Sequence, residues 1–196
     1  YSLDERTEVN FQADAGQNNN KGRRHLSFVS AVASSDYDSQ TAHLGVGIGR
    51  SYAMSERTSV TPSLRMDYTW IKDKSYSETG AGALNLNVGS RTTEALVIGA
   101  DAKVAHQLND RTVLLANLCV GYDTINKRAA LLASYAGAAD ASFVTYGIDP
   151  SPWLVRGGLG ATYKLKDNVE LTGRYDAEYR EKFLNQTASA KVRWSF

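Results

Sequence analysis

Apolar and polar residues alternate along most of the chain with a period of two. Residues 186–196 show it most clearly, because the even-numbered residues from Ala188 to Phe196 are apolar and the odd-numbered ones from Thr187 to Ser195 are polar. Successive side chains of a β-strand point to opposite faces, so this segment predicts a strand with one apolar and one polar, cationic face. The pattern alone fits both a soluble sheet and a membrane barrel.

The same alternation predicts eleven strands, and almost nothing in the chain indicates a helix. The predicted strands are residues 8–15, 25–37, 41–54, 59–72, 83–89, 96–107, 114–123, 142–147, 153–165, 169–180 and 186–196. Residues 16–24 (GQNNNKGRR) are predicted as a polar loop. Residues 127–140 are predicted as a loop that leads into the eighth strand, with a short helix as the alternative.

Three features favour a membrane barrel over a soluble all-β fold. Many predicted strands have 12 to 15 residues, whereas globular strands most often have about 5–6 and a tilted membrane strand needs about 9–11. Short turns (108–111 and 165–168) alternate with longer loops (73–82 and 124–140). Aromatic residues lie near strand ends on the apolar face, as in the girdles of outer-membrane barrels; they are Tyr68, Trp70, Tyr122, Trp153, Tyr163, Tyr179, Trp194 and Phe196.

The amino-acid composition excludes some classes of protein but does not indicate a function. The 196 residues fit a single domain, and 22 basic against 21 acidic residues give a net charge of +1, which does not indicate a nucleic-acid partner. The single Cys119 excludes an internal disulfide. The mean hydropathy of −0.37 does not detect membrane strands, because their two faces average out. The chain lacks an initiator methionine, so we expect Tyr1 to be an internal or processed start.

The segment WLVRGGLGATYKLKDNVELTGRYDAEYREKFLNQTASAKVRWSF (153–196) resembles the translocator domain of autotransporters, the type V secretion proteins. It has a G-x-G strand, a short polar turn, the long GRYDAEY strand and a final amphipathic strand that ends in phenylalanine. The resemblance implies a transmembrane antiparallel up-and-down β-barrel of twelve strands in the outer membrane of a Gram-negative bacterium. It also implies export of an N-terminal passenger, attached by a linker helix that lies inside the barrel.

The resemblance further implies the partners of the domain: outer-membrane lipids, the barrel assembly machinery, and the protein's own passenger and linker helix, around a monomeric barrel. Since we predict eleven strands, we expect residues 1–196 to be one translocator domain whose first strand, linker helix and passenger lie upstream. The alternative is a passenger-free outer-membrane barrel, such as a porin or a barrel hydrolase.

Charged and glycine residues share the polar phase of several strands, so we predict that they line the lumen of the barrel. The candidates are Arg65, Asp67, Arg174, Asp176, Glu178, Arg180, Gly45, Gly47, Gly158 and Gly160. The glycines either make room for a polypeptide or allow strand curvature. The charges either hydrate and anchor the linker or pair across strands. Val192, Trp194 and Phe196 resemble the C-terminal signal that barrels present to their assembly machinery.

The sequence does not indicate catalysis, a cofactor or a metal site. A hydrolase would need a nucleophile, a histidine and an orienting group in one place, and His25, His43 and His106 have no obvious serine beside them. No G-x-S-x-G motif is present. Cys119, in the lumen phase of its strand, is expected to be an inert small residue.

Overall fold

The computed structural model of the chain describes residues 1–149, 151–166 and 168–195, and most of its regular structure is antiparallel β-strand. The strands are β1 (Thr7–Leu26), β2 (Ala31–Arg50), β3 (Tyr52–Ser55), β4 (Thr58–Asp73), β5 (Tyr76–Ser77), β6 (Leu86–Val88), β7 (Arg91–Asn109), β8 (Thr112–Asp123), β9 (Ala130–Tyr135), β10 (Ala138–Tyr146), β11 (Trp153–Lys166), β12 (Val169–Arg180) and β13 (Phe183–Trp194). Two short 3₁₀ turns are η1 (Ser27–Val29) and η2 (Gly82–Leu84). Within the described ranges, no helix has the length and apolarity to cross a membrane.

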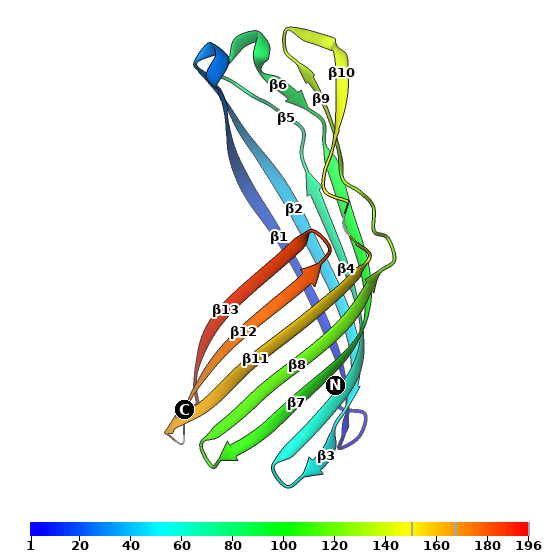
Figure 1. Cartoon of the computed structure of the whole chain (residues 1–196), viewed down its shortest axis with the longest axis vertical. Helices are drawn as coiled ribbons and strands as arrows, with labels where there is room; N and C mark the ends of the chain where they lie inside the picture. The colour runs from blue at the N-terminus through cyan, green and yellow to red at the C-terminus, as the bar shows by residue number, and fades with distance from the viewer. Residues whose placement is uncertain (150, 167, 196) are drawn as a thin grey trace.

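Eight long strands form one curled sheet in the order β1-β2-β4-β7-β8-β11-β12-β13, with β3 added beside β4. Figure 1 shows this sheet as an open half-barrel, with β13 at one end and β1 at the other. Neighbouring long strands are antiparallel and follow one another along the chain, which is the up-and-down connectivity that the sequence predicts. The predicted fold class is therefore confirmed.

The outward face of the curled sheet is a continuous apolar surface. Residues that face each other across paired strands lie on the same side of a sheet, and one such row crosses six strands as Phe11, Val46, Met66, Ile98, Tyr122 and Trp153. Large side chains of this face are exposed, among them Phe11 (75%), Leu159 (68%) and Trp194 (69%). Such a surface would be an aggregation hazard in water and is suited to lipid.

The apolar outward surface ends at the same level on three neighbouring strands. Ala15, Ala42 and Trp70 form the last apolar row, and the next outward row is Gln17, Gln40 and Lys72. On β4, the outward residues from Val60 to Trp70 are apolar. This stretch is about 34 Å long, and in a tilted strand it spans a height of about 25 Å across the membrane. This height matches the apolar band of outer-membrane barrels, so the change of polarity marks the edge of the membrane.

Strands β1 and β2 continue well beyond this edge. Residues 16–24, predicted as a polar loop, are part of β1 and pair with β2 without interruption up to Leu26 and Ala31. The prediction was wrong because both faces of this part of the hairpin are polar and therefore lack the alternation that identifies a strand. Asn19 donates to Asp36 (2.6 Å) and Asn20 donates to Ser39 (2.8 Å), so cross-strand polar contacts replace apolar packing there.

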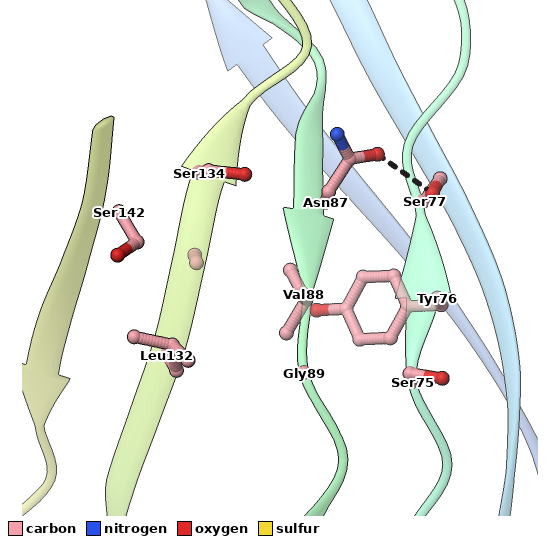
Figure 2. Close-up of a pocket in the computed structure, with 10 residues that line it drawn as sticks. Ser75, Tyr76, Ser77, Asn87, Val88, Gly89, Leu132, Ser134 and Ser142 are labelled. Atoms are coloured by element: carbon pink, nitrogen blue, oxygen red, sulfur yellow. Dashed lines mark hydrogen bonds between the residues drawn. The ribbon is translucent and has the colours of Figure 1, made fainter. Parts of the chain in front are cut away.

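A second, four-stranded sheet in the order β10-β9-β6-β5 stands beside this extension. It joins β2 through the Ser34–Thr79 bridge and the stacked rings of Tyr37 and Tyr76, whose centroids are 4.5 Å apart. We call residues 17–26 of β1, residues 31–40 of β2 and these four strands the collar, which forms the upper part of Figure 1. A row of small polar side chains crosses the second sheet, as Figure 2 shows: Ser142, Ser134, Asn87 and Ser77.

The collar explains the other differences from the predicted strands. Residues 127–140 are not a loop, because they contain β9 and the start of β10. Of the predicted strand 83–89, only Leu86–Val88 forms a strand. The predicted strands 25–37 and 41–54 merge into β2, with β3 following. The eleven predicted strands thus correspond to eight long strands of the main sheet and to short strands of the collar. The predicted turn at 165–168 includes residue 167, which lies outside the described residues.

One buried carboxylate holds the collar together. Arg24 donates to Glu78 through Nε (3.1 Å) and Nη2 (2.6 Å) and also to the Leu84 carbonyl (2.8 Å), while Glu78 accepts the Leu86 amide (2.8 Å). The Glu78 side chain is only 8% exposed. The hydrogen bonds from Arg24, followed by the one from the Leu86 amide, lower the pKa of Glu78 below its ordinary value.

We expect Glu78→Gln to loosen the collar selectively. The substitution removes charge-assisted hydrogen bonds, each of roughly 1.5–3 kcal/mol, so hydrogen exchange at residues 84–88 should become faster at pH 7 while β11–β13 stay protected. Because the pKa is lowered in the folded state, the stabilisation is present above the unfolded pKa of about 4.3 and is lost as the pH falls below it. Acidification, after correction for intrinsic exchange rates, should loosen the wild-type collar but not further loosen the variant. Glu56→Gln, in the turn between β3 and β4, is the control; an equal effect there would contradict the role of Glu78.

Candidate inner-face site

The predicted lumen-lining residues lie together on the inner face of the main sheet, opposite the apolar surface. They fall into two polar clusters: one spans β1, β2 and β4, and the other spans β8, β11 and β12. In both clusters, side chains from strands that are two apart touch each other across the strand between them. Such contacts require a concave face, which identifies this face as the inside of the curl.

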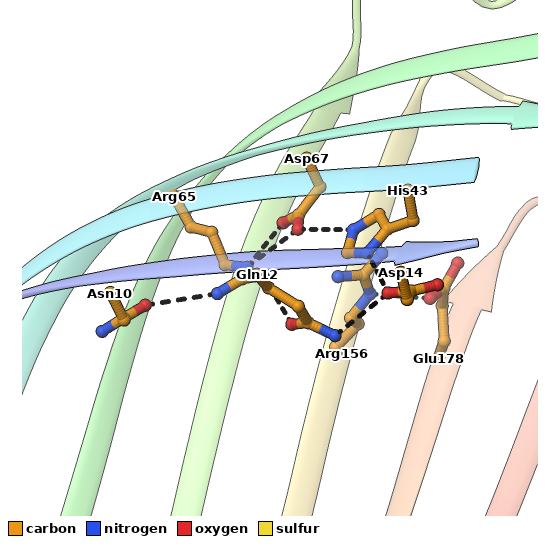
Figure 3. A network of polar contacts seen from close by, with 8 residues as sticks. All are labelled: Asn10, Gln12, Asp14, His43, Arg65, Asp67, Arg156 and Glu178. Atoms are coloured by element: carbon orange, nitrogen blue, oxygen red, sulfur yellow. Dashed lines mark hydrogen bonds and ion pairs between the residues drawn. The ribbon is translucent and has the colours of Figure 1, made fainter.

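The first cluster is centred on His43 of β2 and Arg65 of β4 (Figure 3). His43 Nδ1 lies 2.9 Å from Asp14 and its Nε2 lies 3.0 Å from Asp67. Carboxylates only accept hydrogen bonds when ionised, so both contacts are satisfied together when both ring nitrogens carry a proton. Arg65 donates to Asp67 (2.7 Å) and reaches over β2 to Gln12 (3.0 Å). Three strands are thereby tied together by charge-assisted hydrogen bonds.

The second cluster contains the predicted charges of β12. Arg174 donates to Asp176 through Nε and Nη2 (both 2.7 Å) and reaches across β11 to Asn117 of β8. Glu178 accepts from Arg156 (2.6 Å) and from Arg180 (3.1 Å). Arg180 also lies 3.5 Å from the buried Asp123. The pairs Arg174–Asp176 and Arg180–Glu178 lie within β12, whereas Arg156–Glu178 and Arg180–Asp123 join different strands; a role of these charges in anchoring the linker stays a prediction.

The inner glycines provide the space for these crossings. A Cβ on Gly45 would lie 2.6 Å from Asp67 Oδ1 and in contact with the Arg65 guanidinium, and one on Gly47 would lie 3.0 Å from Asn10 Oδ1. A Cβ on Gly158 would lie 2.5 Å from Asn117 Oδ1 and 2.8 Å from Arg174 Nη2. One on Gly160 would lie 2.9 Å from the Gly173 carbonyl. Gly47 and Gly158 therefore accommodate side chains from both neighbouring strands, and Gly45 and Gly160 accommodate atoms of one neighbouring strand; neither reason was expected from the sequence.

The two clusters border one concave space of about 480 Å³. It is lined by Gln12, His43, Arg65, Asp67, Thr69, Ala95, Val97, Arg156 and Arg180. Its charged lining consists of three arginines and the carboxylate of Asp67, beside His43. Arg65 pairs with Asp67 inside the lining, whereas Arg156 and Arg180 pair with Glu178 beside it. Sequence reasoning missed Gln12, Asp14, Asn117 and Arg156, although all of them occupy the polar phase of a long strand.

Within the described ranges, no group of three His, Cys, Asp or Glu side chains is placed to hold a metal ion. The Thr58 hydroxyl lies 2.9 Å from His106 Nδ1 at the end of β4, but among the described residues no carboxylate is hydrogen-bonded to this ring. Cys119 is 5% exposed and faces inward beside Asp101. The inner face therefore presents polar contacts rather than an assembled nucleophile, base and orienting acid.

Comparisons with known proteins place this geometry in a family. The family model described as "Autotransporter beta-domain" matches residues 1–176. "Outer membrane protein A" of Rickettsia conorii is 32% identical over 168 residues, which is 84% of this chain and 8% of that protein. The protein of the same name from Rickettsia rickettsii is 30% identical over 168 residues, 84% of this chain and 7% of that protein. The chain thus spans less than a tenth of the length of these relatives.

A solved structure has the same fold. The translocator domain of autotransporter NalP from Neisseria meningitidis superposes with a TM-score of 0.80 at 19% sequence identity, over 100% of this chain and 62% of that chain. The chain therefore has the fold of part of a larger translocator domain.

Proposed function

This chain belongs to the autotransporter β-domain family, and we propose that it is the translocator of a longer protein whose passenger precedes Tyr1. It is an outer-membrane domain of a Gram-negative bacterium and serves passenger export to the cell surface. The observation that carries the proposal is the pairing of an outward apolar face with an inward polar face on one curled sheet. Lipid contacts the first face, and the second surrounds the path of a polypeptide.

In this proposal, the inner face is the lumen wall and holds the linker helix. Arg65, Asp67, Arg174 and Glu178 keep the wall hydrated. The contacts of Arg65 with Gln12, of Arg174 with Asn117 and of Glu178 with Arg156 connect different strands and help to hold them in register. A wall whose charges are already paired attracts neither sign of charge strongly, so polypeptides of differing sequence can pass. The space of about 480 Å³ between the clusters is where the linker would rest after export.

The full barrel contains twelve strands in this proposal, as expected for the family. Since the main sheet has eight and aligns with 62% of the NalP translocator chain, four further strands, rather than the single one expected from the sequence, would come from upstream. They would close the gap between β13 and β1. Closure is required because unpaired backbone groups in lipid cost several kcal/mol each.

The remaining features of the proposal concern partners and chemistry. We propose that the barrel is monomeric, that the assembly machinery inserts it, and that it performs no catalysis. Any enzymatic or adhesive activity of the whole protein would belong to the passenger.

Export can be tested with a peptide epitope placed directly upstream of the complete twelve-strand domain in a Gram-negative host. We expect protease added to intact cells to remove the epitope, while the domain keeps the heat-modifiable mobility of a folded barrel on gels. A variant that lacks β13 is the control and should show neither property. A folded, membrane-inserted domain with an inaccessible epitope would exclude the translocator function and favour a passenger-free barrel.

The lumen assignment predicts a labelling pattern on β13. In a Cys119→Ser background, we expect a membrane-impermeant thiol reagent to label Ser189→Cys, which shares the inner face with Arg174, and to leave Ala190→Cys unlabelled in lipid. The two neighbouring positions control for local accessibility. Labelling of position 190 alone would reverse the assignment of the two faces.

A further inference from the structure

The first residues of the chain already lie along the free edge of β1. Ser2 forms an antiparallel bridge with Glu8, the Tyr1 nitrogen donates to the Val9 carbonyl (2.7 Å), and the Val9 amide donates to the Tyr1 carbonyl (2.8 Å). The Leu3 amide donates to the Thr7 carbonyl (2.9 Å). Strand β1 pairs with β2 on its other side, so this contact occupies the edge that ends the main sheet.

A tight turn directs the chain onto this edge. The Asp4 carboxylate accepts hydrogen bonds from the amides of Arg6 and Thr7 (both 2.8 Å) and from the Thr7 hydroxyl (3.0 Å). An aspartate that bonds the backbone two and three residues ahead stabilises a turn. The turn lies at the same rim as the short β7–β8 turn, opposite the collar (Figure 1).

Beyond Val9, the free edge of β1 resembles the edge of a strand that is paired on both sides. It forms twenty consecutive pairs with β2 without a register shift, and it contains no proline. Natural edge strands are protected by bulges, prolines, short length or charged side chains. This one has none of the first three, and its charges beyond Gln17 are Lys21, Arg23 and Arg24 near the end of the strand. The backbone groups of Phe11, Ala13 and Ala15 that point to this edge lie within the apolar band, where an unpaired group is costly.

We propose that the segment directly preceding Tyr1 in the complete protein is a strand that pairs with β1 along its whole length, from the membrane to the top of the collar. The inference deepens the proposed function and rests on it for the part of the strand in lipid. The part of the strand in the collar is inferred from the free edge of β1 beyond Gln17, which continues without interruption. The collar then continues upstream as a wall around the exit of the barrel.

The Ser2–Glu8 bridge fixes the register of this strand. Counting backwards from Tyr1, which faces Val9, the third preceding residue faces Gln12 and the eleventh faces Asn20. The second, fourth and sixth preceding residues face Phe11, Ala13 and Ala15 and should be apolar. From the eighth, which faces Gln17, outward residues should be polar. The strand should reach about 17 residues upstream, the distance from Val9 to Leu26.

The test uses engineered disulfides in the complete protein with Cys119→Ser and an epitope-tagged passenger. Directly opposed residues that do not share hydrogen bonds have Cα atoms about 4.5 Å apart, which suits a disulfide. One variant places cysteines at Gln12 and the third preceding residue, and another at Asn20 and the eleventh. The control pairs Asn20 with the twelfth preceding residue, whose side chain would point to the opposite face.

We expect both matched pairs to crosslink nearly completely and the control to remain reduced. If the Gln12 pair crosslinks and the Asn20 pair does not, the strand stops at the membrane and the proposal is overturned while the barrel stands. If neither pair crosslinks and the epitope still reaches the cell surface, another segment covers β1, which also overturns it. Loss of epitope export in the Cys119→Ser parent would instead count against the proposed function.

Discussion

Gly158→Val should lower the stability of the barrel by about 1–3 kcal/mol, seen as a lower urea midpoint for loss of heat-modifiable mobility in detergent. A valine side chain would occupy the place where Arg174 crosses β11 to reach Asn117. The guanidinium would have to move, and hydrogen bonds to charged groups contribute roughly 1.5–3 kcal/mol each. The expected loss of stability is small because the Arg174 and Asp176 side chains are 33% and 40% exposed, so water replaces part of the lost hydrogen bonding.

The neighbouring glycine supplies a matched control. Gly157 lies on the outward face, and the nearest atom to a Cβ there would be the Asn117 carbonyl oxygen at 3.9 Å. Gly157→Val adds the same side chain to the same strand, removes the same backbone flexibility and raises strand propensity, so it should be neutral or slightly stabilising. Equal midpoint shifts for the two variants would mean that strand flexibility, rather than the crossing of Arg174, explains the inner glycine.

A double-mutant cycle separates crowding of Arg174 from other effects of the valine. If the valine acts by displacing the guanidinium, Gly158→Val should cost much less in an Arg174→Met background, where no guanidinium has to move. An undiminished cost in that background would point to the Asn117 or Asp176 side chains instead.

The roles of the inner glycines show where sequence reasoning stops. The alternation along 59–72 and 169–180 predicted which residues share a face, because that depends only on the strand period. The function of Gly158 depends on which strands flank β11 and in what register, which places Asn117 and Arg174 on either side of it. That information is not contained in the local pattern of any single strand.

The collar was missed for a related physical reason. Hydrophobic alternation marks a strand only where one face meets water and the other meets lipid or a core. Residues 17–26 have polar groups on both faces, and residues 130–135 are mostly small and apolar on both faces. These segments are extended because they pair with a neighbouring strand, and their two faces do not meet different surroundings. Their sequences therefore lack alternation and resemble those of loops.

Removing the aromatic end of the chain should block insertion in cells far more than folding in detergent. Trp194 pairs with Val169 on the outward face and is 69% exposed, so it contributes little to internal packing. Phe196 lies outside the described residues, and its expected place in the same aromatic phase with Val192 and Trp194 stays a prediction. A single terminal side chain contributes at most about 1.5–3 kcal/mol by burial, whereas an assembly signal that is not recognised leaves the whole barrel outside the membrane.

The test compares two assays on the same variants of the complete protein: deletion of Phe196, and Trp194→Ala. We expect a loss of roughly tenfold or more in the amount of folded barrel in the outer membrane, which corresponds to about 1.4 kcal/mol if insertion follows signal recognition, and nearly unchanged refolding yield into detergent micelles. Leu184→Ala is the control, because Leu184 lies on the same strand and face but at the opposite end. Equal losses in both assays would make the terminus a structural element. An unchanged amount in cells would exclude the signal role, and a loss with Leu184→Ala of the same size would assign recognition to the strand as a whole.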